Sequence, residues 1–104
     1  SPTVIRAIIR GRIGFEGVLV TDDLAMKALS GTPADLARQA LAAGCDVALY
    51  CSGDLATTAG LLEQCPPLAA GAAARLMAAH GLAKRRRIAL DAAGLAAERN
   101  RLLA

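Results

Sequence analysis

The feature that most constrains this chain is a short apolar run that ends abruptly at two carboxylates. Residues 18–21 read VLVT, without alternating apolar and polar side chains, and Asp22 and Asp23 follow at once. Such a run is typical of a β-strand that is buried on both faces, as in a parallel sheet. Because reacting groups of parallel α/β folds lie at the carboxyl ends of strands, we interpret Asp22 as a candidate reacting group.

The remaining chain alternates predicted helices and strands, with clear start signals at Ser1-Pro2, Thr32-Pro33 and Ser52-Gly53-Asp54. Apolar side chains at helical spacing predict the buried faces of the first three helices: Val4, Ile5, Ile8 and Ile9; Leu36, Ala37, Ala40 and Leu41; Leu55, Ala59 and Leu62. In order, we predict a helix from residue 2 to Gly11, a strand over 15–21, a loop with a helical turn at 24–29, a helix over 33–43, a strand over 46–51, and helices over 54–64, 69–85 and 92–103.

This order predicts an α/β fold with two parallel strands and flanking helices, because the connection between the strands is long enough for a right-handed crossover. Two parallel strands leave open edges and do not form a domain by themselves. The spacing of about 30 residues per strand–helix unit fits the C-terminal portion of a TIM-type (β/α)8 barrel. Residues 1–104 are then a partial catalytic domain, and Pro66-Pro67 begins a helical C-terminal extension over 66–104.

Charge and cysteine usage narrow the possible partners and the compartment. The net charge is +3, and much of the excess lies in the basic run Lys84–Arg87. No aromatic residue flanks that run, so we interpret it as a solvated helix end and expect neither a nucleic acid nor a membrane as partner. The three cysteines form no CxxC pair, which favours reduced thiols in the cytoplasm over a disulfide framework or a metal site. No signal peptide or membrane-spanning run is apparent.

The two adjacent carboxylates allow several kinds of chemistry. An aspartate at the end of a strand can be a nucleophile, a general base, a metal ligand or a cap for the next turn. Because neighbouring strand residues point to opposite faces, Asp22 and Asp23 are not expected to share a proton. The pattern fits one working carboxylate beside a residue that caps the turn at 24–29. From the spacing alone, the alternative that both carboxylates are turn and cap residues stays open.

A longer pattern around these residues resembles a known family. It comprises IIRGR at 8–12, Gly17 after four further residues, VLVTD at 18–22 and Ala25. This pattern is similar to the active-site signature of glycoside hydrolase family 3. The run GFEGVLVTDDLAM at 14–26 resembles the form found in its bacterial β-N-acetylhexosaminidases. The stretch AGCD at 43–46 and the strand after it resemble the last strand–helix unit of that family.

The resemblance implies a specific reaction. Asp22 would be the nucleophile of a retaining hydrolysis that removes terminal β-linked N-acetylglucosamine from glycans or cell-wall muropeptides during peptidoglycan recycling. Thr21 and Asp23 would support it, and Met26 would line the sugar pocket, although methionine at such a place also serves plain packing. No cofactor and no metal are implied.

The resemblance also implies that half of the catalytic apparatus lies elsewhere. In this subfamily the acid/base group is an Asp/His pair on a loop of an earlier barrel unit, and the groups that grip the sugar also come earlier. The one histidine, His80, lies between Ala79 and Gly81 in a predicted helix and is expected on the helix surface or at its end. We therefore expect this chain to supply only the nucleophile, to be inactive alone and to need the missing N-terminal barrel units.

Three alternatives come from other classes of protein. A response-regulator receiver domain also has an apolar strand that ends in an Asp-Asp pair, but its phosphoacceptor aspartate ends a later strand, where this chain reads YCSG at 50–53. A haloacid-dehalogenase-type phosphatase needs Asp-x-Asp, whereas Asp22 and Asp23 are adjacent. A non-catalytic structural or interaction module remains open because the helices are rich in alanine.

Overall fold

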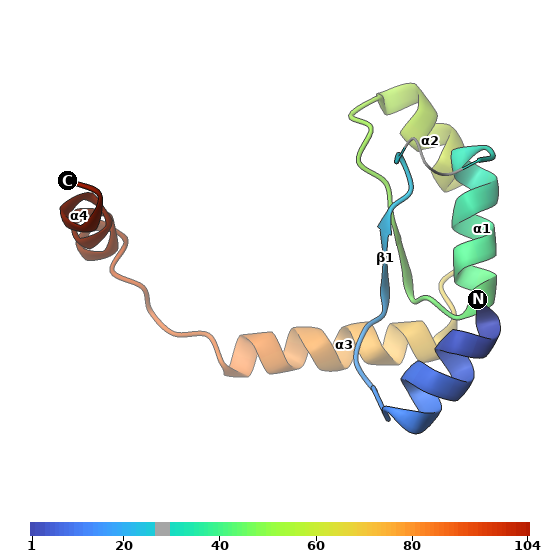
Figure 1. Cartoon of the computed structure of the whole chain (residues 1–104), viewed down its shortest axis with the longest axis horizontal. Coiled ribbons are helices and arrows are strands. Elements are labelled where there is room, and N and C mark those ends of the chain that lie inside the picture. Colours follow the sequence, from blue (N-terminus) through green and yellow to red (C-terminus); the bar gives the residue numbers. More distant parts are fainter. Residues whose placement is uncertain (27–29) are drawn as a thin grey trace.

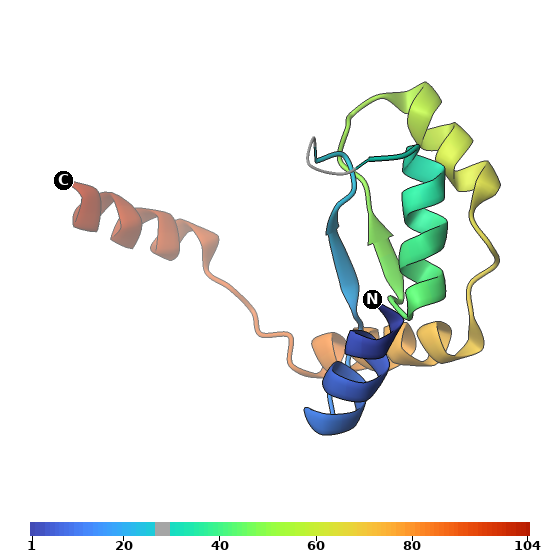
Figure 2. The ribbon, with the colours of Figure 1, turned by 45° about the vertical axis from the view of Figure 1, so that its right-hand side comes forward.

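Two short parallel strands organise the structure. The computed structural model describes residues 1–26 and 30–104. Strands β1 (Val20–Asp23) and β2 (Val47–Leu49) pair in parallel. Helices α1 (Pro33–Ala43) and α2 (Leu55–Gln64) lie on one side of this sheet, and α1 packs against both β2 and α2 (Figure 1 and Figure 2). The predicted parallel pairing and its helical connection are confirmed, whereas the predicted turn at 24–29 lies partly on residues outside the described ones.

Strand β1 is shifted relative to its prediction over 15–21. The carbonyl oxygens of Phe15 and Gly17 accept hydrogen bonds from Arg10, at 2.8 and 2.7 Å, instead of joining a strand ladder. Pairing begins only at Val20 and runs through Asp23. The prediction was therefore wrong at both ends of this strand, because a side chain from the first helix takes acceptors that a ladder would need. Strand β2 is likewise shorter than the predicted 46–51.

The first helix, η1 (Val4–Arg12), is a π-helix rather than the predicted α-helix. Its last turn is closed by the Ile13 N–H, which donates to the Ile8 carbonyl at 2.8 Å. In this geometry hydrogen bonds span five residues, so an apolar stripe spaced by four does not stay on one face. Of the predicted stripe only Ile5 is buried, and Val4 and Ile8 are about half exposed.

The starts of the next two helices are confirmed by their caps. The Thr32 hydroxyl accepts from the Asp35 N–H at 3.2 Å, and the Asp54 carboxylate accepts from the Thr57 N–H at 2.8 Å. The predicted buried face of α2 was wrong: Leu61 is buried, whereas Leu55 and Leu62 are exposed. Helix α1 decides which side of α2 is covered, and the spacing within α2 carries no information about that neighbour.

Helices α3 (Ala70–Arg85) and α4 (Ala92–Leu103) complete the chain. An extended segment carries α4 away from the rest of the molecule (Figure 1 and Figure 2), and α4 buries no residue. The radius of gyration is 18.1 Å, against about 13 Å for a compact domain of this length. The accessible surface is 7927 Å², against about 5,500 Å² for a compact monomer of this mass. The structure is therefore open rather than closed on itself.

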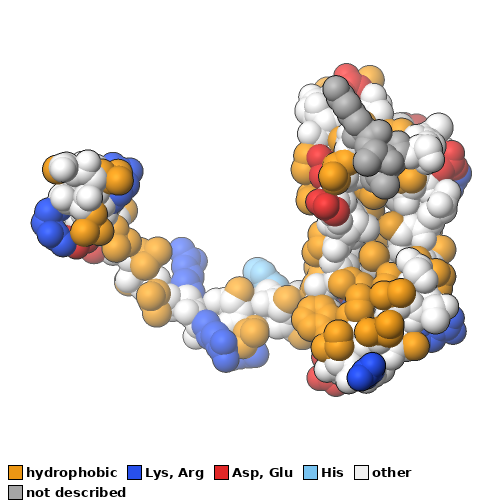
Figure 3. All heavy atoms as spheres, in the orientation of Figure 1, with side chains coloured by type: hydrophobic (Ala, Val, Ile, Leu, Met, Phe, Trp, Pro, Cys, Tyr) orange, Lys and Arg blue, Asp and Glu red, His pale blue; other side chains and the backbone are white. Residues whose placement is uncertain are grey.

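The core is thin, and large apolar side chains remain on the surface. Among the described residues the buried apolar ones are Ile5, Ala34, Ala37, Leu61 and Ala72. Hydrophobic side chains gather on the exposed face over η1 and the start of β1 (Figure 3), where Ile13 is 68% and Val20 48% exposed. The fold is thus α/β with two parallel strands and flanking helices. Residues 1–26 and 30–104 contain one two-stranded sheet and no closed barrel.

Candidate functional site

Strand β1 presents Asp22 at the carboxyl end of the parallel pair. Its side chain is exposed. Within the described part of the chain, its carboxylate accepts one hydrogen bond, at Oδ1 from the N–H of Asp23 at 2.8 Å. The other oxygen has no protein donor among those residues. A carboxylate held by its own backbone, with one oxygen open, is able to meet a ligand.

An extra residue in β1 lies beside this carboxylate. Val20 pairs with Val47 and Asp23 pairs with Leu49, so three steps along β1 match two along β2. Such a bulge interrupts the alternation of side chains and often re-aims one of them next to an active site. Exposure nevertheless still alternates along β1, because Val20 and Asp22 are exposed whereas Thr21 and Asp23 are half-buried, as we expected for side chains that point to opposite faces.

Thr21 and Asp23 bind the end of β1 to β2 through their side chains. The Thr21 hydroxyl accepts from the Leu49 N–H at 2.9 Å. Asp23 Oδ1 accepts from the Cys51 N–H at 3.0 Å and from the Ala25 N–H at 2.9 Å. These contacts replace backbone ladder bonds at the bulge. Asp23 is thus a cap for the turn that follows.

The sugar-pocket residue predicted from the sequence lies beyond this turn. Met26 is 47% exposed, and the Met26 N–H donates to the Asp23 carbonyl at 3.3 Å. His80 is exposed on α3, in agreement with the predicted surface histidine. Thr21, Asp22 and Asp23 thus lie in β1 and Met26 follows Asp23 by three residues, whereas His80 lies on a separate helix.

The opposite end of the strands carries a second carboxylate, which sequence reasoning missed as a site. The Asp46 side chain is 2% exposed and precedes β2. Its Oδ2 accepts from Arg10 Nη2 at 2.8 Å and from the Leu19 N–H at 2.9 Å. Arg75, on α3, donates from Nε at 2.9 and 3.0 Å and from Nη2 to Oδ1 at 2.5 Å. We call Asp46, Arg10 and Arg75 the buried clamp.

Electrostatics keep the carboxylate of the clamp charged. Burial alone would raise the pKa of Asp46. The hydrogen bonds from Arg75 and from the Leu19 N–H, together with the charges of Arg75 and Arg10, outweigh burial and hold that pKa below its ordinary value. The only local signal in the sequence was an aspartate immediately before an apolar strand. No spacing rule links it to Arg75, which lies 29 residues later.

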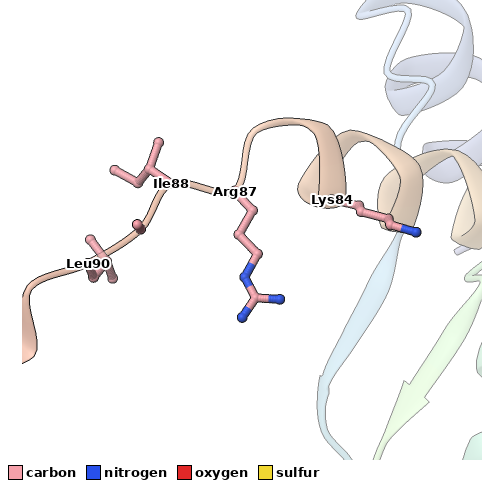
Figure 4. A pocket seen from close by; sticks show the side chains of 5 residues that line it. Lys84, Arg87, Ile88 and Leu90 are labelled. Carbon is pink, nitrogen blue, oxygen red and sulfur yellow. The ribbon is translucent and has the colours of Figure 1, made fainter.

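Two hollows lie outside the strand ends. One, of about 710 Å³, is lined by Lys84, Arg87, Ile88, Ala89 and Leu90. Its labelled side chains point away from one another rather than toward a common centre (Figure 4). The other, of about 500 Å³, is apolar and lies behind β2, between α1, α2 and α3. Its lining does not include Asp22, so neither hollow belongs to the strand-end site.

The described residues contain neither a cluster of potential metal ligands nor a membrane-spanning helix. Across residues 1–26 and 30–104, no group of three or more His, Cys, Asp or Glu side chains is arranged to hold a metal ion. None of the helices in that same part of the molecule has both the length and the apolar character needed to cross a membrane.

Comparison with known proteins gives consistent matches. The model of the glycosyl hydrolase family 3 N terminal domain matches residues 1–81. A β-hexosaminidase of Nitrosospira multiformis is 40% identical over 65 residues, which are 61% of this chain and 19% of that protein. A β-hexosaminidase of Chromobacterium violaceum is 47% identical over 62 residues, covering 58% and 17%. The β-hexosaminidase of Shewanella frigidimarina is 41% identical over 61 residues, covering 57% and 18%. The chain thus spans less than a fifth of each relative.

Proposed function

Because this chain belongs to glycosyl hydrolase family 3, we propose that it is the part of a β-hexosaminidase that carries the catalytic nucleophile, Asp22. The observation that supports this most is the place of Asp22. Its exposed carboxylate lies near the carboxyl end of a strand of a parallel pair, within the stretch that the family model matches. The shared name of the relatives supports a hexosamine-containing glycan as the substrate.

The proposed reaction proceeds in two displacements. The open oxygen of Asp22 attacks the anomeric carbon of a terminal β-linked N-acetylglucosamine, and the bond to the leaving oxygen breaks as that oxygen takes a proton from an acid. Water then attacks the glycosyl-enzyme and releases the sugar with retained configuration. Thr21 and Asp23 hold the strand end by their bonds to Leu49 and Cys51. Met26 lines the sugar pocket.

The acid/base group is proposed to come from other barrel units of the whole protein. A retaining enzyme needs a second carboxyl or equivalent group about 5 Å from the nucleophile. Asp23 is a poor candidate because it is half-buried and its carboxylate is fixed to β2 and to the following turn by the N–H groups of Cys51 and Ala25. We therefore propose that this chain alone is inactive, that it forms the last units of a TIM-type barrel, and that residues 66–104 are a helical extension.

A cytoplasmic role in peptidoglycan recycling completes the proposal. Cys45, Cys51 and Cys65 are all free thiols, as suits a reducing compartment. Neither a nucleic acid nor a membrane is proposed as partner. Membership of family 3 leaves the receiver-domain alternative without support. The non-catalytic interaction module keeps one observation in its favour, namely the exposed apolar side chains over η1 and β1.

The decisive experiment uses a hybrid enzyme. In it, the full 104-residue chain replaces the matching segment of the Chromobacterium violaceum relative. We expect the hybrid to release para-nitrophenol from the β-N-acetylglucosaminide, and Asp22→Asn to lower kcat by about 10³-fold or more, the scale for loss of a covalent nucleophile. Asp35→Asn, an exposed aspartate on α1, is the matched control and should retain the parental rate. Near-parental turnover of the Asp22→Asn hybrid would reduce Asp22 to a turn residue.

A second measurement identifies the nucleophile directly. A fluorinated N-acetylglucosaminide that slows hydrolysis of the covalent intermediate should label the hybrid, and mass spectrometry of its peptides should locate the sugar on Asp22. A label on any other carboxylate would contradict the proposal even if the Asp22→Asn hybrid were inactive.

A further inference from the structure

The buried clamp lies at the far end of the strands from Asp22, yet it holds the segment that leads to it. Asp46 forms hydrogen bonds with both the N–H and the carbonyl of Leu19. Its carboxylate accepts from the Leu19 N–H, and the Leu19 carbonyl accepts from the N–H groups of Asp46 and Val47, at 2.8 and 3.2 Å. The first regular pair of the sheet, Val20 with Val47, follows immediately. The Leu19–Asp46 contact therefore sets the register of the sheet.

Register at Leu19 decides where Asp22 emerges. Asp22 lies three residues further, about 10 Å along an extended strand. A slip of one residue would turn each side chain of β1 to the other face. Backbone pairing alone constrains the register only weakly, because β1 has four residues, β2 has three, and a bulge interrupts their pairing. The side-chain contact at Leu19 carries much of the specification.

The two arginines connect this contact to the helices. Arg10 of η1 donates to Asp46 and also to the carbonyls of Phe15 and Gly17, so one guanidinium shapes the approach to β1. Arg75 of α3 donates to both carboxylate oxygens of Asp46 and lies beyond the break at residues 66–67. The helical extension thus reaches back to the strand that carries Asp22.

We propose that Asp46, held between Arg10 and Arg75, is a positioning residue that fixes the register of β1 and thereby the place of Asp22. This inference rests on the proposed function of Asp22 as nucleophile. Asp46 does not touch the substrate, because its side chain is buried at the opposite end of the sheet. The proposal also makes α3 part of the catalytic unit, since Arg75 on that helix supplies donors to both carboxylate oxygens of Asp46.

The test measures kcat and KM of the hybrid enzyme separately. Asp46→Asn keeps the shape of the side chain but removes its charge and one acceptor. We expect kcat to fall about 10²-fold, the cost of a nucleophile displaced by roughly 1 Å. KM should change little, because the groups that grip the sugar come from other units. Asp35→Asn, which removes an exposed ion pair with Arg38 on α1, is the matched control and should leave both constants unchanged.

Two further variants separate positioning from charge balance. Arg75→Lys keeps a positive charge but not the fork geometry, so kcat should fall less than in Asp46→Asn; Arg38→Lys is its control. In the double variant Asp46→Ala with Arg75→Gln, one uncompensated arginine is gone but the Leu19 N–H still has no side-chain acceptor, so kcat should stay low. Recovery of kcat in the double variant would assign Asp46 to charge balance and overturn the proposal.

A readout independent of activity uses amide hydrogen exchange of the full chain. The Leu19 N–H should lose its protection in Asp46→Ala, which has no side-chain acceptor, and the Leu49 N–H, which binds Thr21, should lose part of its own. Parental kcat in both Asp46→Asn and Arg75→Lys would overturn the inference, as would an equal loss of helical circular dichroism and of activity in both. If the Asp22→Asn hybrid were active, the proposed function would fail instead, and exchange at Leu19 would still report on the register.

Discussion

The two ends of the strand pair hold carboxylates in opposite ways. At the carboxyl end Asp22 is exposed and accepts one hydrogen bond within the described residues, from the backbone of its neighbour. At the amino end Asp46 is buried and accepts from two arginines and a backbone N–H. Open oxygens can react, whereas oxygens saturated by donors hold the structure together. The same side chain therefore has two roles, and its environment decides which.

The contrast follows the general organisation of barrel folds. Groups at the carboxyl ends of strands perform chemistry, and groups at the amino ends contribute stability. Here the strands are so short that Leu19, which Asp46 binds at the amino end, lies only three residues before Asp22. The contact that stabilises the amino end therefore also sets the geometry at Asp22. Variants at each end should separate these effects.

The largest contrast is expected from Asp22→Asn. In the hybrid enzyme this change should lower kcat by about 10³-fold or more. The midpoint of thermal unfolding should stay unchanged, because the side chain is exposed. Differential scanning calorimetry beside the chromogenic assay measures both quantities on the same sample. A clear drop in the midpoint would mean that Asp22 also supports the fold, and the contrast between the two ends would be lost.

The next largest effect is expected on stability, from Asp46→Asn. Loss of the buried charge leaves Arg10 and Arg75 facing each other without a counter-ion, which should lower the free energy of unfolding by about 3 kcal/mol. Urea unfolding followed by circular dichroism tests this, with Asp35→Asn as the exposed control. Equal midpoints for the two variants would show that the clamp does not stabilise the sheet.

Acid should remove the same contribution. The pKa of Asp46 is lowered in the folded protein from an ordinary value of 3.8. Its stabilising effect is therefore fully present above that value and is lost as the pH falls through the folded pKa. Unfolding free energies measured from about pH 5 downward should decline more steeply in the parent than in Asp46→Asn. Parallel curves would contradict the charged state of the clamp.

The smallest effect is expected at the bulge, from Thr21→Val. Valine has the same shape but leaves the Leu49 N–H without its acceptor, so stability should fall by about 1 kcal/mol. Thr21→Ser keeps the hydroxyl and is the control for the lost bond. If the valine and serine variants have equal kcat and stability, the Thr21–Leu49 contact does not hold the strand end.

Local signals predicted much of the fold, and they failed where distant groups intervene. Thr32 and Asp54 marked their helices correctly because a cap depends on residues three positions away. The predicted start of β1 was wrong because Arg10 donates hydrogen bonds to the carbonyls of Phe15 and Gly17. The place of Asp22 near the carboxyl end of a strand was predictable from the apolar run, although the structure extends that strand through Asp23, and the bulge beside it depends on pairing with β2.

The sequence by itself determined the family, the order of the elements and the position of Asp22 at the end of a strand, since all three depend on neighbours along the chain. Only the tertiary structure decided that Asp46 joins Arg10 and Arg75, because these residues lie on separate elements that meet only after folding. A buried charge needs hydrogen-bond donors, and those donors come from whichever elements pack against it. Sequence spacing does not specify which elements these are.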